Sequence, residues 1–231
     1  MEIKTSYIRT YVLRSGKISS AQKRCYEELF PLYGIRGNVQ LNFAELFGNN
    51  NPLVAEIGFG MGRATAEIAL RNPDINYLGI EVHKPGIGRL LWDIEKNNIK
   101  NIRIAEADAK EFIASSTQDE SVSAFHIFFP DPWQKKRHHK RRLMMRPFTD
   151  LLSSKLVKDG YIYMVTDWED YGDFALSELG ETPGLENRYD GFAERQSWRP
   201  ITEFENKGLK KNHEIRELYF TRKMQTEIFV K

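Results

Sequence analysis

Cysteine is nearly absent from this sequence, because its 231 residues include only Cys25. One thiol cannot form a disulfide within the chain, and the five histidines are too scattered to give zinc-ligand spacing. No apolar run approaches the roughly 20 residues that a membrane helix needs, and the N-terminus lacks the apolar core of a secretion signal. We therefore expect a cytoplasmic protein with no disulfide, no metal site and no membrane segment.

Strong net charge is also absent, but the charges that are present are unevenly placed. The total is +2. Residues 131–146 carry +6 and residues 1–37 carry +4, so the rest of the chain carries −8. Two basic segments on an otherwise acidic chain favour a nucleic-acid partner. A solvated basic face without a partner stays open as the alternative, above all for residues 1–37.

Short apolar runs alternate with helical patterns along most of the chain. We expect a basic N-terminal extension over residues 1–37 that contains a short helix over 21–30. The sequence does not decide whether this extension is ordered. One domain should follow over residues 38–231. Within the domain the expected strands are 53–57, 77–82, 102–108, 122–130, 160–167 and 214–223, and the expected helices are 63–70, 85–97, 144–157 and 169–179. This alternation predicts an α/β fold with a mostly parallel sheet, whose strands end at one ligand-binding edge.

A glycine turn, "EIGFGMGRA", follows the first expected strand. Its glycines are Gly58, Gly60 and Gly62, and a dinucleotide fingerprint would need another glycine where this chain has Arg63. The spacing therefore argues against a pyrophosphate site, although the turn still lets a ligand approach the backbone closely. A tight strand-to-helix connection without a ligand is the alternative.

Acidic residues come at the ends of the first three expected strands: Glu56, Glu81 and Asp108. Since parallel strands end at a common edge, these side chains should converge on one crevice. Such a crevice suits hydroxyls, amines and positive charge. S-adenosylmethionine offers all three, whereas the phosphates of ATP would be repelled. Helix capping or solvation of each acid separately is the alternative.

The stretch "FFPDPWQKKRHHKRR" ends the fourth expected strand. Pro130 and Pro132 restrict the backbone on both sides of Asp131, which fixes this acid at the same edge of the sheet. The basic run that follows could bind phosphates. A rigid turn with a packed Trp133 would also explain the first part of the motif.

Together with "EIGFGMG", "GIEVH", "VTDW" and "TEFE", this stretch resembles the bacterial-type tRNA (guanine-N7-)-methyltransferases over residues 53–223. The resemblance implies a class I methyltransferase fold, Rossmann-like, with a mostly parallel seven-stranded sheet, one antiparallel strand and helices on both faces. It also implies S-adenosyl-L-methionine as cofactor and tRNA as partner. The implied reaction is methyl transfer to N7 of guanine, at guanine 46 of the variable loop.

The resemblance assigns roles to individual residues. It implies cofactor binding by Glu56, Gly58, Gly60, Gly62, Glu81, Asp108 and Asp131, with Asp131 also the catalytic residue. It implies substrate binding by Lys135, Arg137, Lys140, Arg141, Arg142, Asp167, Thr202, Glu203, Phe204 and Glu205. Guanine N7 carries a lone pair and no proton, so we expect Asp131 to orient the base and stabilise charge rather than remove a proton.

Two other functions remain open at this stage. The same cofactor could serve methylation of another atom or base of RNA, or the chain could be a non-catalytic RNA-binding module. The acidic edge argues against the second, because an RNA-binding module has no need of it. Whether the protein is a monomer or a homodimer is not decided by the sequence.

Overall fold

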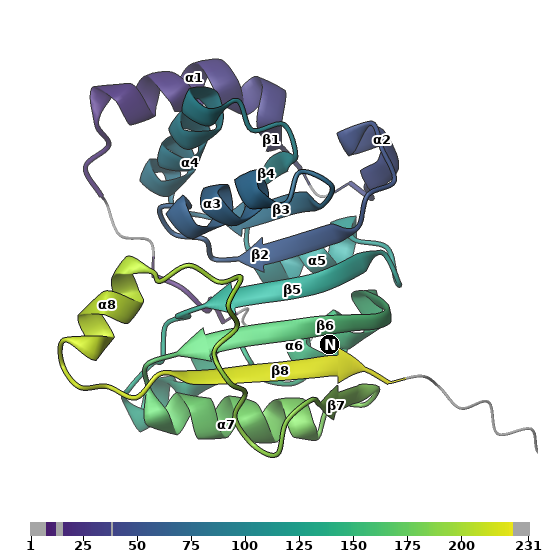
Figure 1. The fold of residues 1–231 in the computed structure, drawn as a ribbon, viewed down its shortest axis with the longest axis vertical. Coiled ribbons are helices and arrows are strands. Elements are labelled where there is room, and N and C mark those ends of the chain that lie inside the picture. Colours follow the sequence, from purple (N-terminus) through teal and green to yellow (C-terminus); the bar gives the residue numbers. More distant parts are fainter. Residues whose placement is uncertain (1–7, 13–15, 38, 224–231) are drawn as a thin grey trace, which may run out of the picture.

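A computed structural model of the protein describes residues 8–12, 16–37 and 39–223. The remaining residues belong to the predicted N-terminal extension or lie at residue 38 and after residue 223, and fall outside the description. The described chain forms one eight-stranded sheet covered by helices (Figure 1). None of the helices in these ranges is long and apolar enough to cross a membrane.

The sheet has the strand order β1-β4-β3-β2-β5-β6-β8-β7. Its strands are β1 (Gly34–Ile35), β2 (Leu53–Ile57), β3 (Asn76–Glu81), β4 (Ile102–Glu106), β5 (Val122–Phe128), β6 (Leu156–Thr166), β7 (Leu185–Asn187) and β8 (Arg216–Arg222). Of the described strands, β8 alone runs in the opposite direction, so it is antiparallel to both β6 and β7. This confirms the predicted α/β fold with one antiparallel strand. Eight strands are described rather than seven, because the two-residue β1 pairs with β4 at the sheet edge.

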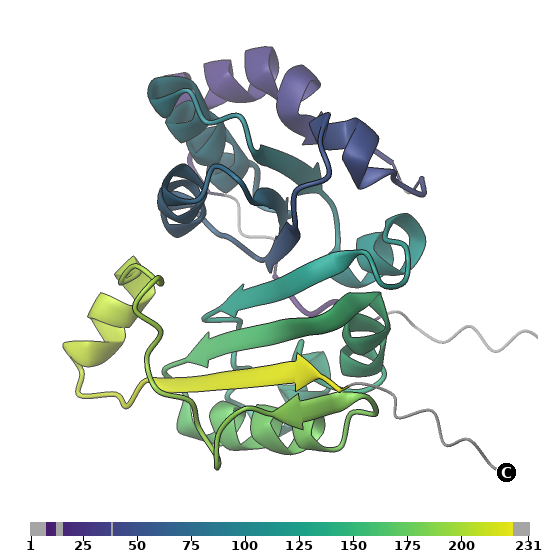
Figure 2. The same cartoon turned by 45° about the vertical axis from the view of Figure 1, so that its right-hand side comes forward.

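The helices form two layers (Figures 1 and 2). Helices α1 (Ser20–Tyr33), α3 (Arg63–Arg71) and α4 (Lys84–Asn97) contribute to the hydrophobic cluster on one face. Helices α5 (Ala109–Ser116), α6 (Phe148–Lys155) and α7 (Glu169–Gly180) contribute to the cluster on the other face, where α2 (Phe43–Phe47) also packs. The last helix, α8 (Glu203–Leu209), lies beyond the carboxyl ends of β5 and β6 (Figure 1).

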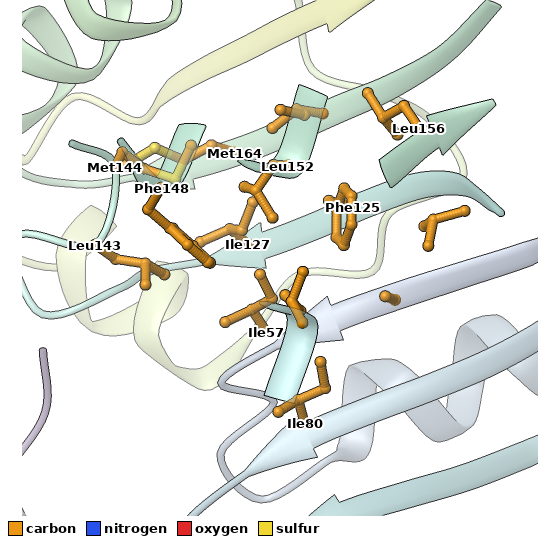
Figure 3. Packing of buried hydrophobic residues seen from close by; sticks show 14 of the residues in the cluster. Ile57, Ile80, Phe125, Ile127, Leu143, Met144, Phe148, Leu152, Leu156 and Met164 are labelled. Atoms are coloured by element: carbon orange, nitrogen blue, oxygen red, sulfur yellow. The ribbon is translucent and has the colours of Figure 1, made fainter. Parts of the chain in front are cut away.

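Strand β2 shows why the central strands are apolar throughout. Leu53, Ala55 and Ile57 belong to the cluster under α5–α7, whereas Val54 belongs to the cluster on the other face. Successive side chains of a strand point to opposite faces, so a strand covered on both sides has no polar face. Figure 3 shows Ile57 packed near Ile80, in the cluster that also contains residues of α6.

Helix α1 belongs to the predicted N-terminal extension but packs against the rest of the fold. Ser19 and Gln22 form a capping box, which starts the helix at residue 20 rather than 21. The Gln22 side chain donates a hydrogen bond to the carbonyl of Pro85 at 3.1 Å, and Cys25 and Phe30 are buried. Helix α1 therefore packs as part of the sheet layers, and the division of the chain at residue 37 stays a prediction.

Helix α4 makes a close contact with the glycine turn. A Cβ atom placed on Gly86 would lie 1.9 Å from the carbonyl oxygen of Gly60. Only a residue without a side chain allows this approach, so Gly86 sets how closely α4 packs behind the turn.

We expect Gly86→Ala to destabilise the protein by on the order of 2 kcal/mol, because the added methyl group overlaps backbone that cannot move freely. Gly180→Ala is the matched control. Gly180 also lies in a helix, and an added Cβ there meets no atom within 4 Å. It should be neutral or stabilise by up to about 1 kcal/mol. Urea unfolding of both variants measures the difference, and equal stabilities would contradict the packing account.

Candidate active site

A cavity of about 630 Å³ lies at the carboxyl ends of β2, β3 and β5. Its described lining comes from residues 10–12, 56–64, 80–83, 128–131 and 200–204, with a few single residues between them. This is the edge that the sequence predicted for the ligand, and α8 adds a wall that the sequence analysis did not include.

The glycine turn forms one side of the cavity. Gly58, Gly60 and Gly62 have φ values of 74°, 58° and 70°, the left-handed region that glycine adopts most easily. A Cβ on Gly58 or Gly60 would meet no protein atom within 4 Å. The turn therefore presents bare backbone to the cavity.

Glu81 holds the turn in place. Its Oε2 atom accepts a hydrogen bond from the Gly60 amide at 2.8 Å. Its Oε1 atom accepts from the amides of Val82 at 2.7 Å and His83 at 3.1 Å. These three bonds tie the glycine turn to the end of β3 and keep the Glu81 carboxylate at the cavity wall.

Glu56 lies at the floor of the cavity and is 4% exposed. Burial raises the pKa of this carboxyl to about 7, and the nearby negative charge of Glu81 adds to the effect. Glu56 is therefore poised to ionise near neutral pH when a positive charge enters the cavity.

Asp108 caps α5 beside the cavity. Its Oδ1 atom accepts hydrogen bonds from the amides of Lys110 at 2.9 Å and Glu111 at 3.3 Å. Its Oδ2 atom is buried and has no hydrogen-bond partner among the described residues. A buried acceptor without a partner is costly, so this atom suits a ligand that brings a donor. Ala107 and Ala109, on either side of it, line the cavity.

The described lining is strongly acidic. It contains the carboxylates of Glu56, Glu67, Glu81, Asp131 and Glu203, and its only Arg or Lys is Arg63. An anionic ligand such as a nucleoside triphosphate would be repelled here. The residues fit a cationic ligand that also carries hydrogen-bond donors.

Asp131 is exposed at the cavity edge, just beyond β5. The segment around it is anchored at both ends. The Phe129 amide donates to the carbonyl of Val165 at 2.8 Å, and the Trp133 indole donates to the carbonyl of Thr10 at 3.0 Å. Phe129 and Trp133 both have left-handed backbone, with φ of 52° and 50°. Such strained residues are found at functional sites, where the surrounding contacts hold them.

The basic run forms a short 3₁₀ helix, η1 (Lys136–Arg141). Lys135, Arg137 and Lys140 are exposed. Arg141 is half-buried, and its guanidinium lies 4.9 Å from the centre of the Trp133 ring. These cations lie directly after Asp131 in the chain and are available to phosphates.

The resemblance implies that Arg142 binds the substrate, but its side chain is only 1% exposed. Its Nε atom donates to the carbonyl of Pro132 at 3.1 Å, and its guanidinium pairs with Asp170. The same group lies about 5 Å from the rings of Tyr171 and Phe174. A guanidinium buried in this way cannot reach an RNA phosphate, so in this structure Arg142 fixes the Asp131 segment onto α7.

The "TEFE" motif divides into two kinds of residue. Thr202 and Glu205 form the capping box of α8, and Glu205 is buried against Arg199 at 2.5 Å. Glu203 and Phe204 face the cavity together with Thr202, whereas Glu205 is not in its lining. Glu205 therefore builds the wall rather than contacting a ligand in it.

Asp167 lies outside the described lining of the cavity. Its Oδ2 atom lies 3.1 Å from Nδ1 of His213. A Cβ on Gly208 would lie 2.9 Å from the same oxygen, which shows how closely α8 packs on it. Here Asp167 supports α8, and the substrate contact that the resemblance implies for it stays a prediction.

Sequence reasoning missed three parts of the site. Residues 10–12 and Arg63 line the cavity, and Arg199 lies buried between Glu205 and Glu217 behind α8. The T-x-x-E pattern at 202–205 was a readable helix start. Nothing local in the sequence marks residues 10–12, Arg63 or Arg199, because their roles come from tertiary contacts.

Solved structures with the same fold are methyltransferases. The 16S rRNA methyltransferase KamB matches with a TM-score of 0.55 at 14% identity, over 94% of this chain and 100% of that one. The antibiotic-resistance methyltransferase Kmr also matches at 0.55, with 13% identity, over 81% and 95%. At such identities the likeness concerns the fold alone, and that fold is the class I methyltransferase fold.

Sequence comparison is more specific. The family described as "Putative methyltransferase" matches residues 50–218. The tRNA (guanine-N(7)-)-methyltransferase of Dechloromonas aromatica is 45% identical over 94% of this chain and 89% of its own length. The protein of the same name from Chromobacterium violaceum is 46% identical over 94% and 96%. The chain belongs to this methyltransferase family, which confirms the resemblance found in the sequence.

The raised pKa of Glu56 predicts a pH dependence of stability. The folded state holds the Glu56 proton more tightly than the unfolded state does. Protonated Glu56 therefore makes its whole contribution to the free energy of unfolding below pH 4.5, and this contribution is lost as pH rises through about 7. Glu56→Gln removes this loss. Relative to wild type, the ligand-free variant should gain on the order of 3 kcal/mol between pH 4.5 and 8. Denaturant unfolding across this range measures it, and a constant difference would show that Glu56 is not perturbed.

Arg142 and Arg137 should behave as different kinds of arginine. We expect Arg142→Met to lower stability by on the order of 2 kcal/mol, since it removes hydrogen bonds from a charged group, and to leave the salt dependence of tRNA binding unchanged. Arg137→Gln should leave stability within about 0.5 kcal/mol and lower the slope of log affinity against log salt by about 1. The reverse pattern would make Arg142 an RNA contact.

Proposed function

We propose that the protein transfers a methyl group from S-adenosyl-L-methionine to N7 of guanine in tRNA, at guanine 46 of the variable loop. The names of the curated relatives support the guanine-N7 reaction. The structural observation that carries the proposal is a single cavity joining the acidic, glycine-lined edge of the sheet to Asp131. The exposed cations of η1 follow Asp131 directly in the chain.

The cofactor would bind at the glycine turn. When bound, S-adenosylmethionine supplies a methyl group activated by its positively charged sulfur. Glu56 and the other carboxylates suit that positive charge. Glu81 suits the ribose hydroxyls, and the unsatisfied Oδ2 of Asp108 suits the amino group of adenine.

Asp131 would act on the guanine. N7 attacks with its lone pair, so the enzyme has no proton to remove there. Its main task is to hold N7 in line with the methyl group, and orientation of this kind can supply a large part of a rate enhancement. The methylated base carries positive charge, which a fixed carboxylate at the cavity edge stabilises as it develops. The alternative role for Asp131, and for Asp167, is to accept hydrogen bonds from the N1–H and amino group of guanine, which adenine lacks in that arrangement.

The exposed cations of η1 would hold the RNA backbone next to the target. Neutralising phosphates supplies affinity and position without reading sequence. N7 atoms in folded tRNA are often engaged in tertiary contacts, so the target guanosine has to be turned out. Extrusion of a base costs a few kcal/mol, which these phosphate contacts can offset.

Incubation of an unmodified tRNA transcript with the protein and S-adenosylmethionine tests the proposal. Reduction and aniline treatment then cleave the RNA at 7-methylguanosine. We expect one cleavage site, at guanine 46. Methylation of another atom or position would correct the proposed target. S-adenosylmethionine binding without any methyl transfer to tRNA would contradict the proposed function.

Asp131→Asn should lower kcat at least tenfold while the affinity for tRNA and cofactor changes less than threefold, because the neutral amide keeps the shape and loses the charge. Asp74→Asn is the matched control. Asp74 is an exposed aspartate between α3 and β3, at the opposite edge of the sheet. A variant at Asp131 with nearly the wild-type rate would show that the carboxylate only places the base, or is not needed.

A further inference from the structure

Arg63 bridges the mouth of the cavity. It is the first residue of α3, and its guanidinium pairs with the carboxylate of Glu203, the first residue of α8. Both residues line the cavity, and both side chains are 59% exposed. The pair therefore joins the glycine-turn side of the cavity to the α8 side, at a position that solvent and ligands reach.

Apolar side chains gather at the same mouth. Met61, Ile201 and Phe204 line the cavity and are 41%, 54% and 61% exposed. Single exposed apolar side chains are ordinary, but a group of them around one cavity marks a binding surface. The flat faces of a nucleobase suit such a surface, because stacking on an aromatic ring does not depend on base identity.

The charges at the mouth make Arg63 the group of the described lining that attracts a polyanion. Arg63 is the only Arg or Lys in the described lining, among five carboxylates. Of these, Glu67 is already paired with Arg71. Glu203 is paired with Arg63 itself. A phosphate that entered this acidic lining without meeting a cation would be repelled.

The existing ion pair is easily exchanged. An exposed pair of this kind contributes little to stability, since water and salt screen it. A phosphodiester offers a guanidinium the same bidentate geometry and the same single negative charge as a carboxylate. Replacing Glu203 by a phosphate therefore costs little.

We propose that Arg63 binds a phosphate next to the target nucleotide, releasing Glu203, while the base enters over Phe204 and its apolar neighbours. Before RNA arrives, Glu203 holds Arg63 across the mouth and neutralises it. This inference rests on the proposed RNA methylation and adds a substrate-binding residue to it.

Steady-state kinetics with an unmodified tRNA transcript test the inference. Arg63→Gln should raise KM for tRNA about five- to tenfold and lower the salt slope of binding by roughly 0.7 to 0.9, the loss of one phosphate contact. Glu203→Gln should lower KM two- to threefold, because it frees Arg63. That gain should vanish when Arg63→Gln is also present, since the acid acts only through the arginine.

Arg71→Gln is the matched control. Arg71 lies on the same helix, has a 58% exposed side chain and is also paired with a glutamate, but it does not line the cavity. Its substitution should change KM less than twofold. On α8, Phe204→Ala should raise KM severalfold. Leu209→Ala should not, although Leu209 is 48% exposed on the same helix.

Three results would overturn the inference. Arg63→Gln could have no more effect than Arg71→Gln. The gain from Glu203→Gln could persist without Arg63. Alternatively, Arg63→Gln could weaken S-adenosylmethionine binding in the absence of tRNA and leave KM for tRNA unchanged. The pair of Arg63 and Glu203 would then retain the cofactor rather than bind RNA. All three require an active wild-type enzyme, whereas failure of the proposed function would appear as a wild-type protein that forms no 7-methylguanosine.

Discussion

Two acidic groups at the carboxyl edge of the sheet, Glu56 and Asp108, place the strongest constraint on the rest of the site. Burial raises the pKa of Glu56 to about 7, and no residue in the described part of the chain donates a hydrogen bond to the buried Oδ2 of Asp108. Groups of this kind reduce the stability of the ligand-free protein. They are explained by a ligand that brings positive charge and donors, and the surrounding packing keeps the cavity shaped for it.

In the rest of the site, a carboxylate and a group of cations lie close together in the chain but are held in different places. Asp131 stays at the cavity edge because the segment around it is tied to β6 at one end and to Thr10 at the other. Arg142 adds a third tie from within. The exposed cations lie between Asp131 and Arg142 in sequence. In the proposed function, one short segment would therefore present a carboxylate to the base and cations to the backbone of the same RNA.

The sequence predicted the parts whose signals are local. The alternating strands and helices, the glycine turn and the acids after each strand all follow from short patterns, and the structure brings these acids to one edge. The sequence could not predict that Arg142 is buried, because the groups that cover it, Asp170 and Tyr171, are distant in the chain. The pairing of Arg63 with Glu203 spans 140 positions and has no local signal either. The capping of α5 and α8 was readable, and these helices should have been expected.

Isothermal titration of S-adenosylmethionine into the tRNA-free protein tests the central claim most directly, at pH values from 6 to 7.5 and in two buffers of different ionisation enthalpy. If the cationic ligand forces Glu56 to ionise, binding releases protons near pH 7 and affinity rises with pH over this range. The Glu56→Gln protein shows neither effect. Binding without proton release, or affinity that falls as pH rises through this range, would contradict the account.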